Sequence, residues 1–192
     1  LAACIRMATP LTLAGLGEAF SERTGVMNLG VEAIMLCGAF GSFMVTFWTG
    51  NVYWGMLCGM LAGMLISGIH AILCIKCKAN QTIVGLALNF FALGLTSFLF
   101  LIVFGQSTIL PQCKTVPNFE FPLLGKIPLL GKAFFTHNIF VYLMYLLVFI
   151  FLFVYKKTEW GVIFTAVGEH PSAADTAGIN VFRIRYLACM IN

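Results

Sequence analysis

The sequence predicts an all-α fold: a polytopic transmembrane helical bundle with about five full spans, the start of a sixth, and a short cytoplasmic helix. Two observations predict it. Of the 192 residues, 60% are hydrophobic and 9% are charged, whereas about 25% of the residues in a soluble domain are charged. The apolar residues also form runs of about 20, which is long enough to cross about 30 Å of hydrocarbon.

The net charge of +4 does not indicate nucleic-acid binding, because the basic residues lie in short loops between the apolar runs. Basic residues in such loops set the orientation of membrane helices. The seven cysteines lie mostly inside apolar runs and predict neither a disulfide framework nor a metal site. Cys74 and Cys77 form a C-x-x-C pair, but a structural zinc site needs four ligands and no second pair supplies them. We expect no metal and no cofactor.

Residues 1–20 form the first predicted span, and the polar turn after it leads into a second span over residues 28–48. Gly25 is predicted to end the first helix and Asn28 to cap the second. A charge at the centre of a membrane helix costs about 2.5–3.5 kcal/mol. We therefore expect Glu18 and Glu32 to face a water-filled cavity, a partner or the interface rather than lipid.

Residues 52–75 form the third predicted span, which carries small residues at the spacing that lets helix backbones approach closely, Gly59 and Gly63. Its one polar candidate is His70, which is either a hydrogen-bonded packing residue or a proton relay. Residues 81–104 form the fourth span. Within it Asn89 needs a hydrogen-bond partner, since an unpaired amide in hydrocarbon is unfavourable. Asn89 either touches a substrate or ties two helices together.

Residues 105–136 are predicted to form an external loop with a short interfacial or re-entrant piece, and residues 137–155 the fifth span. The loop 156–185 is flanked by four basic residues, which places it in the cytoplasm; they are Lys156, Lys157, Arg183 and Arg185. A sixth span starts at residue 181. We expect a single transmembrane domain over residues 1–192, cut from a longer chain.

A small polar interruption in that loop, residues 168–179, is predicted to form a helix of about two turns. Its first residue is either Pro171, or Ser172 acts as the cap with Asp175 three residues on, and Gly178 ends it in the left-handed conformation. A helix of that length is marginal in water. We expect the membrane domain to brace one side and a partner to dock on the other, although an ordinary capped loop helix fits the same residues.

Three motifs carry a family resemblance. The pattern Gly168-Glu169-x-Pro171-x-Ala173-Ala174-x-x-x-Gly178-Ile179 resembles the coupling loop of ABC-importer permeases of the simple-sugar, nucleoside and branched-chain amino acid class. The N-terminal pattern Thr9-Pro10-x6-Gly17-x4-Glu22-Arg23-x-Gly25-Val26-x-Asn28-Leu29-Gly30-Val31-Glu32 is similar to nucleoside-type permeases, which work with basic membrane lipoproteins. Gly85-Leu-x-Leu-Asn89 is similar to a motif of the same permeases. Glu22 and Arg23 also fit a solvated pair at a helix end.

The resemblance implies a membrane-spanning permease subunit of an ATP-driven importer for nucleosides or simple sugars, multi-pass in the bacterial cytoplasmic (inner) membrane. It implies these ATPase-coupling residues: Gly168, Glu169, Pro171, Ala173, Ala174, Gly178 and Ile179. The candidate substrate path is Asn28, Glu32 and Asn89. The implied partners are ABC ATPase subunits, a second permease subunit (homo- or heterodimer), an extracytoplasmic substrate-binding protein, a small-molecule solute and membrane lipid, with no nucleic acid.

The chain has no phosphate-binding loop of the form G-x-x-x-x-G-K-[ST], so we predict that it is not an enzyme and that a partner subunit hydrolyses ATP. The main alternative is an ion-gradient-driven secondary transporter with Glu18, Glu32 and His70 as its ion-coupled groups. A third is a scaffold membrane protein. The 19 phenylalanines could stack a nucleobase, but they are also ordinary lipid-facing residues.

Overall fold

The computed structural model describes residues 2–105, 112–113, 115–116, 118–120 and 136–192. The described chain is helical except for turns and two three-residue strands, so the all-α prediction is confirmed. It forms two compact units: residues 1–16 with 115–162, and residues 17–114 with 163–192. The single transmembrane domain expected over residues 1–192 stays a prediction.

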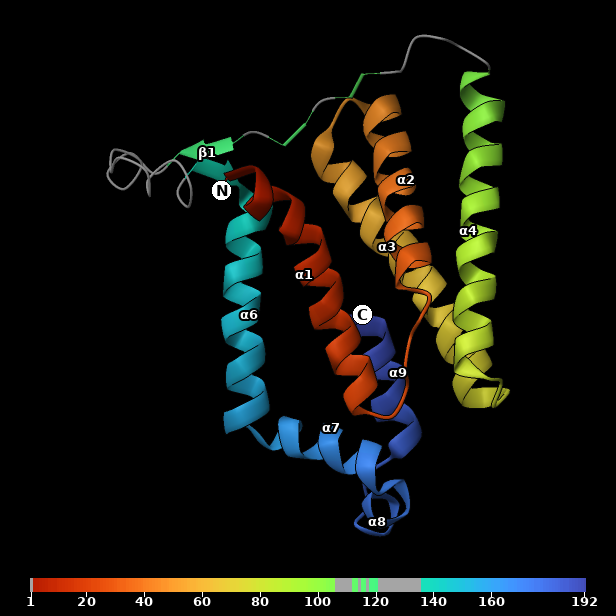
Figure 1. The fold of residues 1–192 in the computed structure, drawn as a ribbon, viewed down its shortest axis with the longest axis vertical. Coiled ribbons are helices and arrows are strands. Elements are labelled where there is room, and N and C mark those ends of the chain that lie inside the picture. The colour runs from red at the N-terminus through yellow and green to blue at the C-terminus, as the bar shows by residue number, and fades with distance from the viewer. Residues whose placement is uncertain (1, 106–111, 114, 117, 121–135) are drawn as a thin grey trace. The chain divides into compact units, whose positions relative to one another are not determined.

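The first unit contains the start of α1, two short strands, α6 and the start of α7. Their bounds are α1 (Ala2–Arg23), β1 (Asn118–Glu120), β2 (Thr136–Asn138), α6 (Ile139–Lys157) and α7 (Glu159–Glu169). The strands pair antiparallel, with Asn118 opposite Asn138, and β2 continues directly into α6. The start of α1 and the start of α6 lie side by side (Figure 1). Most of the loop predicted over residues 105–136 lies outside the described residues.

The second unit contains the end of α1, the end of α7 and five further α-helices. Their bounds are α2 (Val31–Thr49), α3 (Val52–Ala71), α4 (Gln81–Phe104), α8 (Pro171–Thr176) and α9 (Val181–Ile191). α2 packs on α3 and α4, and α9 packs on α3 (Figure 1). Small residues allow the α2–α3 contact, because a methyl group added at Gly59 would lie 2.8 Å from the Gly38 carbonyl oxygen.

α3 ends in one turn of π-helix, η1 (Ile72–Lys76), in which the Cys77 N–H donates to the Ile72 carbonyl at 3.2 Å. Asn80 then caps α4, since its Oδ1 accepts from the backbone N–H of Thr82 at 3.0 Å. These two features bring the chain out of one apolar helix and into the next within a few residues.

Among the described residues, four helices are long and apolar enough to cross a membrane: Val31–Thr49, Val52–Lys76, Gln81–Phe104 and Ile139–Lys157. They correspond to the second to fifth predicted spans. The first predicted span is the 22-residue helix α1, which is not one of the four, and residues from 181 form the 11-residue α9. The count of five spans and the start of a sixth therefore stays a prediction.

Two local predictions were wrong, and one pair of alternatives is decided. α2 begins at Val31 with Gly30 at the capping position, so Asn28 does not cap it. Residues 159–169, treated as part of a loop, form α7. Of the two predicted starts of the short helix, Pro171 is confirmed, because α8 begins there, and Ser172 is not the cap. Proline suits the first helical position because it has no backbone N–H that needs a partner.

Candidate functional site

The turn between α1 and α2 is held by its own polar groups. The Ser21 hydroxyl donates to the Val26 carbonyl at 2.7 Å, and the Thr24 hydroxyl donates to the Ser21 carbonyl at 2.8 Å. Gly25 has φ +82°, a conformation that favours glycine, so the prediction that Gly25 ends the first helix is confirmed. These bonds within the turn fix its shape.

Asn28 lies at the buried side of this turn and is 1% exposed. Its backbone N–H donates to Glu18 Oε1 at 2.7 Å, and its Oδ1 accepts from the Gly30 N–H at 2.9 Å. The other carboxylate oxygen of Glu18 accepts from Asn192 Nδ2 at 2.8 Å. Asn28 Nδ2 has no hydrogen-bond partner among the described residues. Both carboxylate oxygens of Glu18 thus accept hydrogen bonds from within the protein, and the buried Asn28 Nδ2 is left without an acceptor.

Two amides of α4 fasten the turn from the other side. Asn89 accepts from the Ala33 N–H at 2.9 Å and donates to the Leu29 carbonyl at 3.1 Å. Gln81 Oε1 accepts from the Met27 N–H at 2.8 Å. Asn89 therefore ties α4 to the start of α2, one of the two roles that the sequence left open.

Glycine makes this attachment close. A methyl group added at Gly85 would lie 2.9 Å from the Gly30 nitrogen and 2.9 Å from the Leu29 carbonyl carbon, so the α4 backbone lies directly against the turn. Glu32 is exposed on the first turn of α2 and makes none of these bonds. The structure brings Asn28 and Asn89 to one turn and leaves Glu32 outside their hydrogen-bond network.

α8 is held by an apolar cluster of Val167, Ala174 and Val181, against which Ile179 packs. Gly178 has φ +86°, and the Ile179 N–H donates to the Ala174 carbonyl at 3.0 Å, so the predicted left-handed end of the helix is confirmed. The opposite side of α8 is open, and its exposed residues are Pro171, Ser172, Ala173 and Asp175, with Glu169 exposed just before them.

Ala174 is placed differently from what a docking surface requires. Its side chain is 3% exposed and packs against Val167 and Val181, so it braces α8 from within the chain. Ala173, next to it, is exposed. An Ala174→Trp variant would disrupt this brace and could not report on docking alone. The coupling role of the predicted residues stays a prediction.

The segment that carries α8 also contacts the α1–α2 turn. Arg185 Nε, on α9, donates to the Thr24 carbonyl at 3.0 Å. A methyl group at Gly168, on α7, would overlap the Arg23 carbonyl oxygen and lie 3.3 Å from the Gly25 nitrogen. Phe20 and Phe164 meet edge to face, with ring centroids 5.7 Å apart. The turn therefore lies between α4 on one side and the α7–α9 segment on the other.

Sequence reasoning missed two of these contact residues. Arg185 entered the prediction only as a topology signal, and Gln81 had no role. Their partners are backbone carbonyl and N–H groups, which every residue carries, so no pairing pattern marks them in the sequence. α7 had a weak signal, since Ile163, Phe164 and Val167 place apolar residues on one helical face.

The three groups proposed for the gradient-driven alternative do not form one cluster. Glu18 bonds to Asn28 and Asn192, and Glu32 is exposed. His70 is fully buried with its Nε2 3.5 Å from Cys74 Sγ. No hydrogen bond joins any two of the three among the described residues.

Comparison with known proteins gives a consistent result. The family model described as branched-chain amino acid transport system / permease component matches residues 1–192. A Haloferax volcanii protein named as a glucose ABC transporter permease is 44% identical over 100% of this chain. The guanosine ABC transporter permease NupQ of Bacillus subtilis is 40% identical, and the nucleoside ABC transporter permease NupC of Lactococcus lactis is 35% identical, each over 96% of this chain. No solved structure matches significantly.

The chain spans 58% of the length of the first of these relatives and 60% of each of the other two.

Proposed function

Because the chain belongs to the branched-chain amino acid transport system permease family, we propose that it is the membrane-spanning permease subunit of an ABC importer for nucleosides or simple sugars. The names of its relatives support both solute classes, since they include glucose, guanosine and nucleoside permeases. The gradient-driven alternative has no support from these relatives. ATP hydrolysis then belongs to a partner subunit.

The proposed assembly has two permease subunits, identical or related, and two ATPase subunits that dock on α8. A substrate-binding protein delivers solute at the outer face of the cytoplasmic (inner) membrane. The basic residues Lys156, Lys157, Arg183 and Arg185 support a cytoplasmic location for α8, because cytoplasmic loops carry an excess of Lys and Arg.

The observation that carries the proposal is that α8 has one buried side and one exposed side. One side is buried against Val167 and Val181, while Glu169, Pro171 and Ala173 are exposed. A six-residue helix does not persist by itself in water. Its brace makes it a rigid element that a partner can push, and the small Ala173 side chain permits close approach by a groove.

The α1–α2 turn is the proposed element through which α8 moves the substrate path. α8 packs on α9, and Arg185 of α9 bonds to the Thr24 carbonyl in the turn. The same turn carries Asn28 and is fastened by Asn89. A displacement of α8 therefore acts on the turn through direct contacts, which suits a permease that alternates between outward-open and inward-open states.

Asn28, Glu32 and Asn89 remain the proposed substrate-path residues. Asn28 is the best supported, because a buried amide donor without a partner is unfavourable unless something binds it. Nucleosides and sugars carry hydroxyl and carbonyl oxygens that accept from such a donor. Interrupted membrane helices are also where transporters place polar groups toward substrate.

The test is uptake by the full-length permease with its ATPase and binding protein, supplied with labelled guanosine or glucose. We expect uptake to stop when ATP is depleted while the proton gradient is held, and to continue when the gradient is collapsed with ATP present. The reverse pattern would establish the gradient-driven transporter instead.

A further inference from the structure

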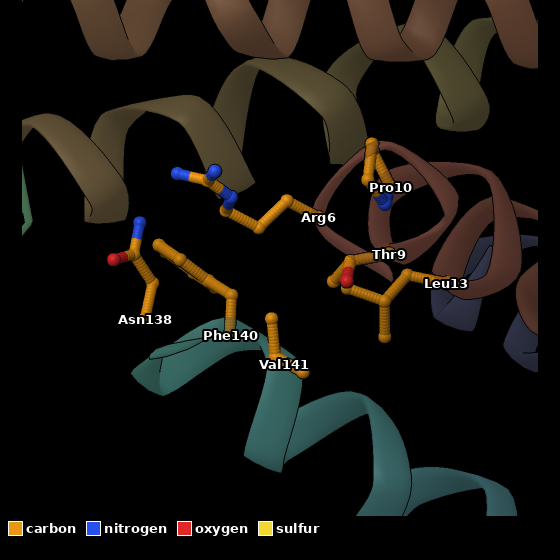
Figure 2. A pocket seen from close by; sticks show the side chains of 7 residues that line it. All are labelled: Arg6, Thr9, Pro10, Leu13, Asn138, Phe140 and Val141. Carbon is orange, nitrogen blue, oxygen red and sulfur yellow. The ribbon is translucent and has the colours of Figure 1, made fainter. Parts of the chain in front are cut away.

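A pocket of about 300 Å³ lies in the first unit, between the start of α1 and the start of α6. Arg6, Thr9 and Leu13 line it from α1, and Asn138, Phe140 and Val141 line it from the other side (Figure 2). None of these residues belongs to the proposed substrate path or to the ATPase-coupling residues. The pocket therefore needs its own explanation.

One end of the pocket carries two polar groups that have no protein partner in the described part of the chain: the exposed Arg6 guanidinium and the buried Asn138 Oδ1. The Arg6 guanidinium makes no hydrogen bond or ion pair with any residue in the described part of the chain. Asn138 occupies the capping position of α6 without making a capping bond, and its buried Oδ1 has no partner there either. Figure 2 shows both groups at the same end of the pocket. The exposed Arg6 guanidinium is available to an anion, and the buried Asn138 Oδ1 lacks a hydrogen-bond donor.

The rest of the pocket is apolar. Leu13 lies two helical turns from Arg6, about 10 Å along α1, and Phe140 and Val141 line the opposite side. Thr9 is 4% exposed and its hydroxyl already donates to the Ile5 carbonyl at 2.8 Å. The lining therefore fits an amphiphile: an anionic group beside a donor at one end, and an apolar chain along the other.

In the predicted topology this polar end lies at the outer face, because Arg6 is near the outer end of the first predicted span and Asn138 follows the predicted external loop. Lipid phosphate groups lie at this depth in a membrane. We infer that the pocket binds one anionic phospholipid, with its phosphodiester on Arg6, a headgroup hydroxyl donating to Asn138 Oδ1, and an acyl chain along Leu13 and Val141. Phosphatidylglycerol carries all three features.

The experiment is native mass spectrometry of the full-length permease, delipidated in detergent and titrated with phosphatidylglycerol, phosphatidic acid, phosphatidylcholine or inorganic phosphate. We expect one phosphatidylglycerol to be retained per chain. Phosphatidylcholine should be retained severalfold less, because it has the same phosphodiester but its headgroup has no hydroxyl to donate to Asn138 Oδ1 and carries a positive charge that would lie beside Arg6. Inorganic phosphate at millimolar concentration should not displace the lipid. Displacement by phosphate, or no retained lipid, would overturn the inference.

Variants separate the two polar contacts. Arg6→Gln should weaken phosphatidylglycerol retention at least about tenfold. Asn138→Ala should weaken it severalfold and leave phosphatidylcholine unchanged, because phosphatidylcholine has no hydroxyl in its headgroup. Arg183→Gln, which removes the same charge from an exposed position on α9, should change neither. Equal losses for Arg6→Gln and Arg183→Gln would show only general attraction to anionic lipid and would overturn the site.

Leu13→Trp tests the acyl end without changing charge. It should fill the apolar end of the pocket and lower the retention of long-chain phosphatidylglycerol, while a short-chain form binds as it does to the wild type. Retention of the long-chain lipid at the wild-type level would contradict the proposed path of the acyl chain.

Discussion

Replacing Gly168 by alanine tests whether the α7–α9 segment rests directly on the α1–α2 turn. Gly168 is next to the last residue of α7, and the added methyl group would overlap the Arg23 carbonyl oxygen and lie 3.0 Å from its carbonyl carbon. These are backbone atoms, and the turn that holds them is fixed by the Ser21 and Thr24 hydroxyl bonds. The methyl group is accommodated only if the segment moves away from the turn.

Two opposing terms set the magnitude. Alanine in place of glycine inside a helix is favourable by about 0.5–1 kcal/mol. Overpacking a close contact costs about 1–3 kcal/mol. We therefore expect Gly168→Ala to lower the free energy of unfolding by up to about 2.5 kcal/mol, a change opposite in sign to that expected for a free helical position.

The assay is the apparent unfolding temperature of the full-length permease, followed by uptake per ATP hydrolysed. The control is Gly94→Ala in α4, where an added methyl group would meet nothing within 4 Å. We expect Gly168→Ala to unfold at a lower temperature than the wild type and to transport less per ATP. Gly94→Ala should unfold at a slightly higher temperature, because alanine is favoured over glycine inside a helix and meets no neighbour there. If Gly168→Ala unfolds at a temperature as high as that of Gly94→Ala, α7 does not rest on the turn.

Two further predictions concern the attachment of α4 to the turn and the end of α8. Asn89→Ala removes the hydrogen bonds to the Ala33 N–H and the Leu29 carbonyl, and we expect it to destabilise the protein by about 1–3 kcal/mol. The measurement is the fall in unfolding temperature. An unchanged temperature would mean that Asn89 does not tie α4 to the turn. The methyl group of Gly178→Ala meets no neighbour, but the residue must adopt φ +86°, so we expect the free energy of unfolding to fall by about 1–2 kcal/mol from the backbone alone. Gly178→Asn should recover part of this loss in the same thermal assay. Equal losses for the two variants would contradict the explanation.

Composition and the length of the apolar runs were enough to predict the helical fold, and the limits of four apolar helices follow closely from those runs. Turn chemistry was also readable, since Gly25 and Gly178 have the positive φ that their positions predicted. The prediction that Asn28 caps α2 was wrong for a physical reason. A capping residue and a residue in an Asx turn have the same sequence preference, and only the fold shows that the Asn28 Oδ1 accepts from the Gly30 N–H two residues ahead.

The sequence predicted which residues belong to the candidate site better than it predicted how they are arranged. Asn28 and Asn89 were selected because polar residues in apolar helices need partners, and the structure brings them to one turn. The exposed and buried sides of α8 were not predictable, because Ala173 and Ala174 are the same residue type in adjacent positions. Their difference is set by the packing of Val167 and Val181, which depends on the folded chain.

Capture of the ATPase subunit by the full-length permease tests the central claim most directly. The comparison is between the wild type, Ala173→Trp on the exposed side of α8, and Thr49→Trp at the predicted external turn. Both positions are exposed. Because Thr49→Trp also removes the hydrogen bond from the Thr49 hydroxyl to the Val45 carbonyl, the unfolding temperature of each variant is measured to show that it is folded. We predict that the wild type and Thr49→Trp capture the ATPase and that Ala173→Trp does not. Equal capture by all three, or no capture by the wild type, would contradict the account.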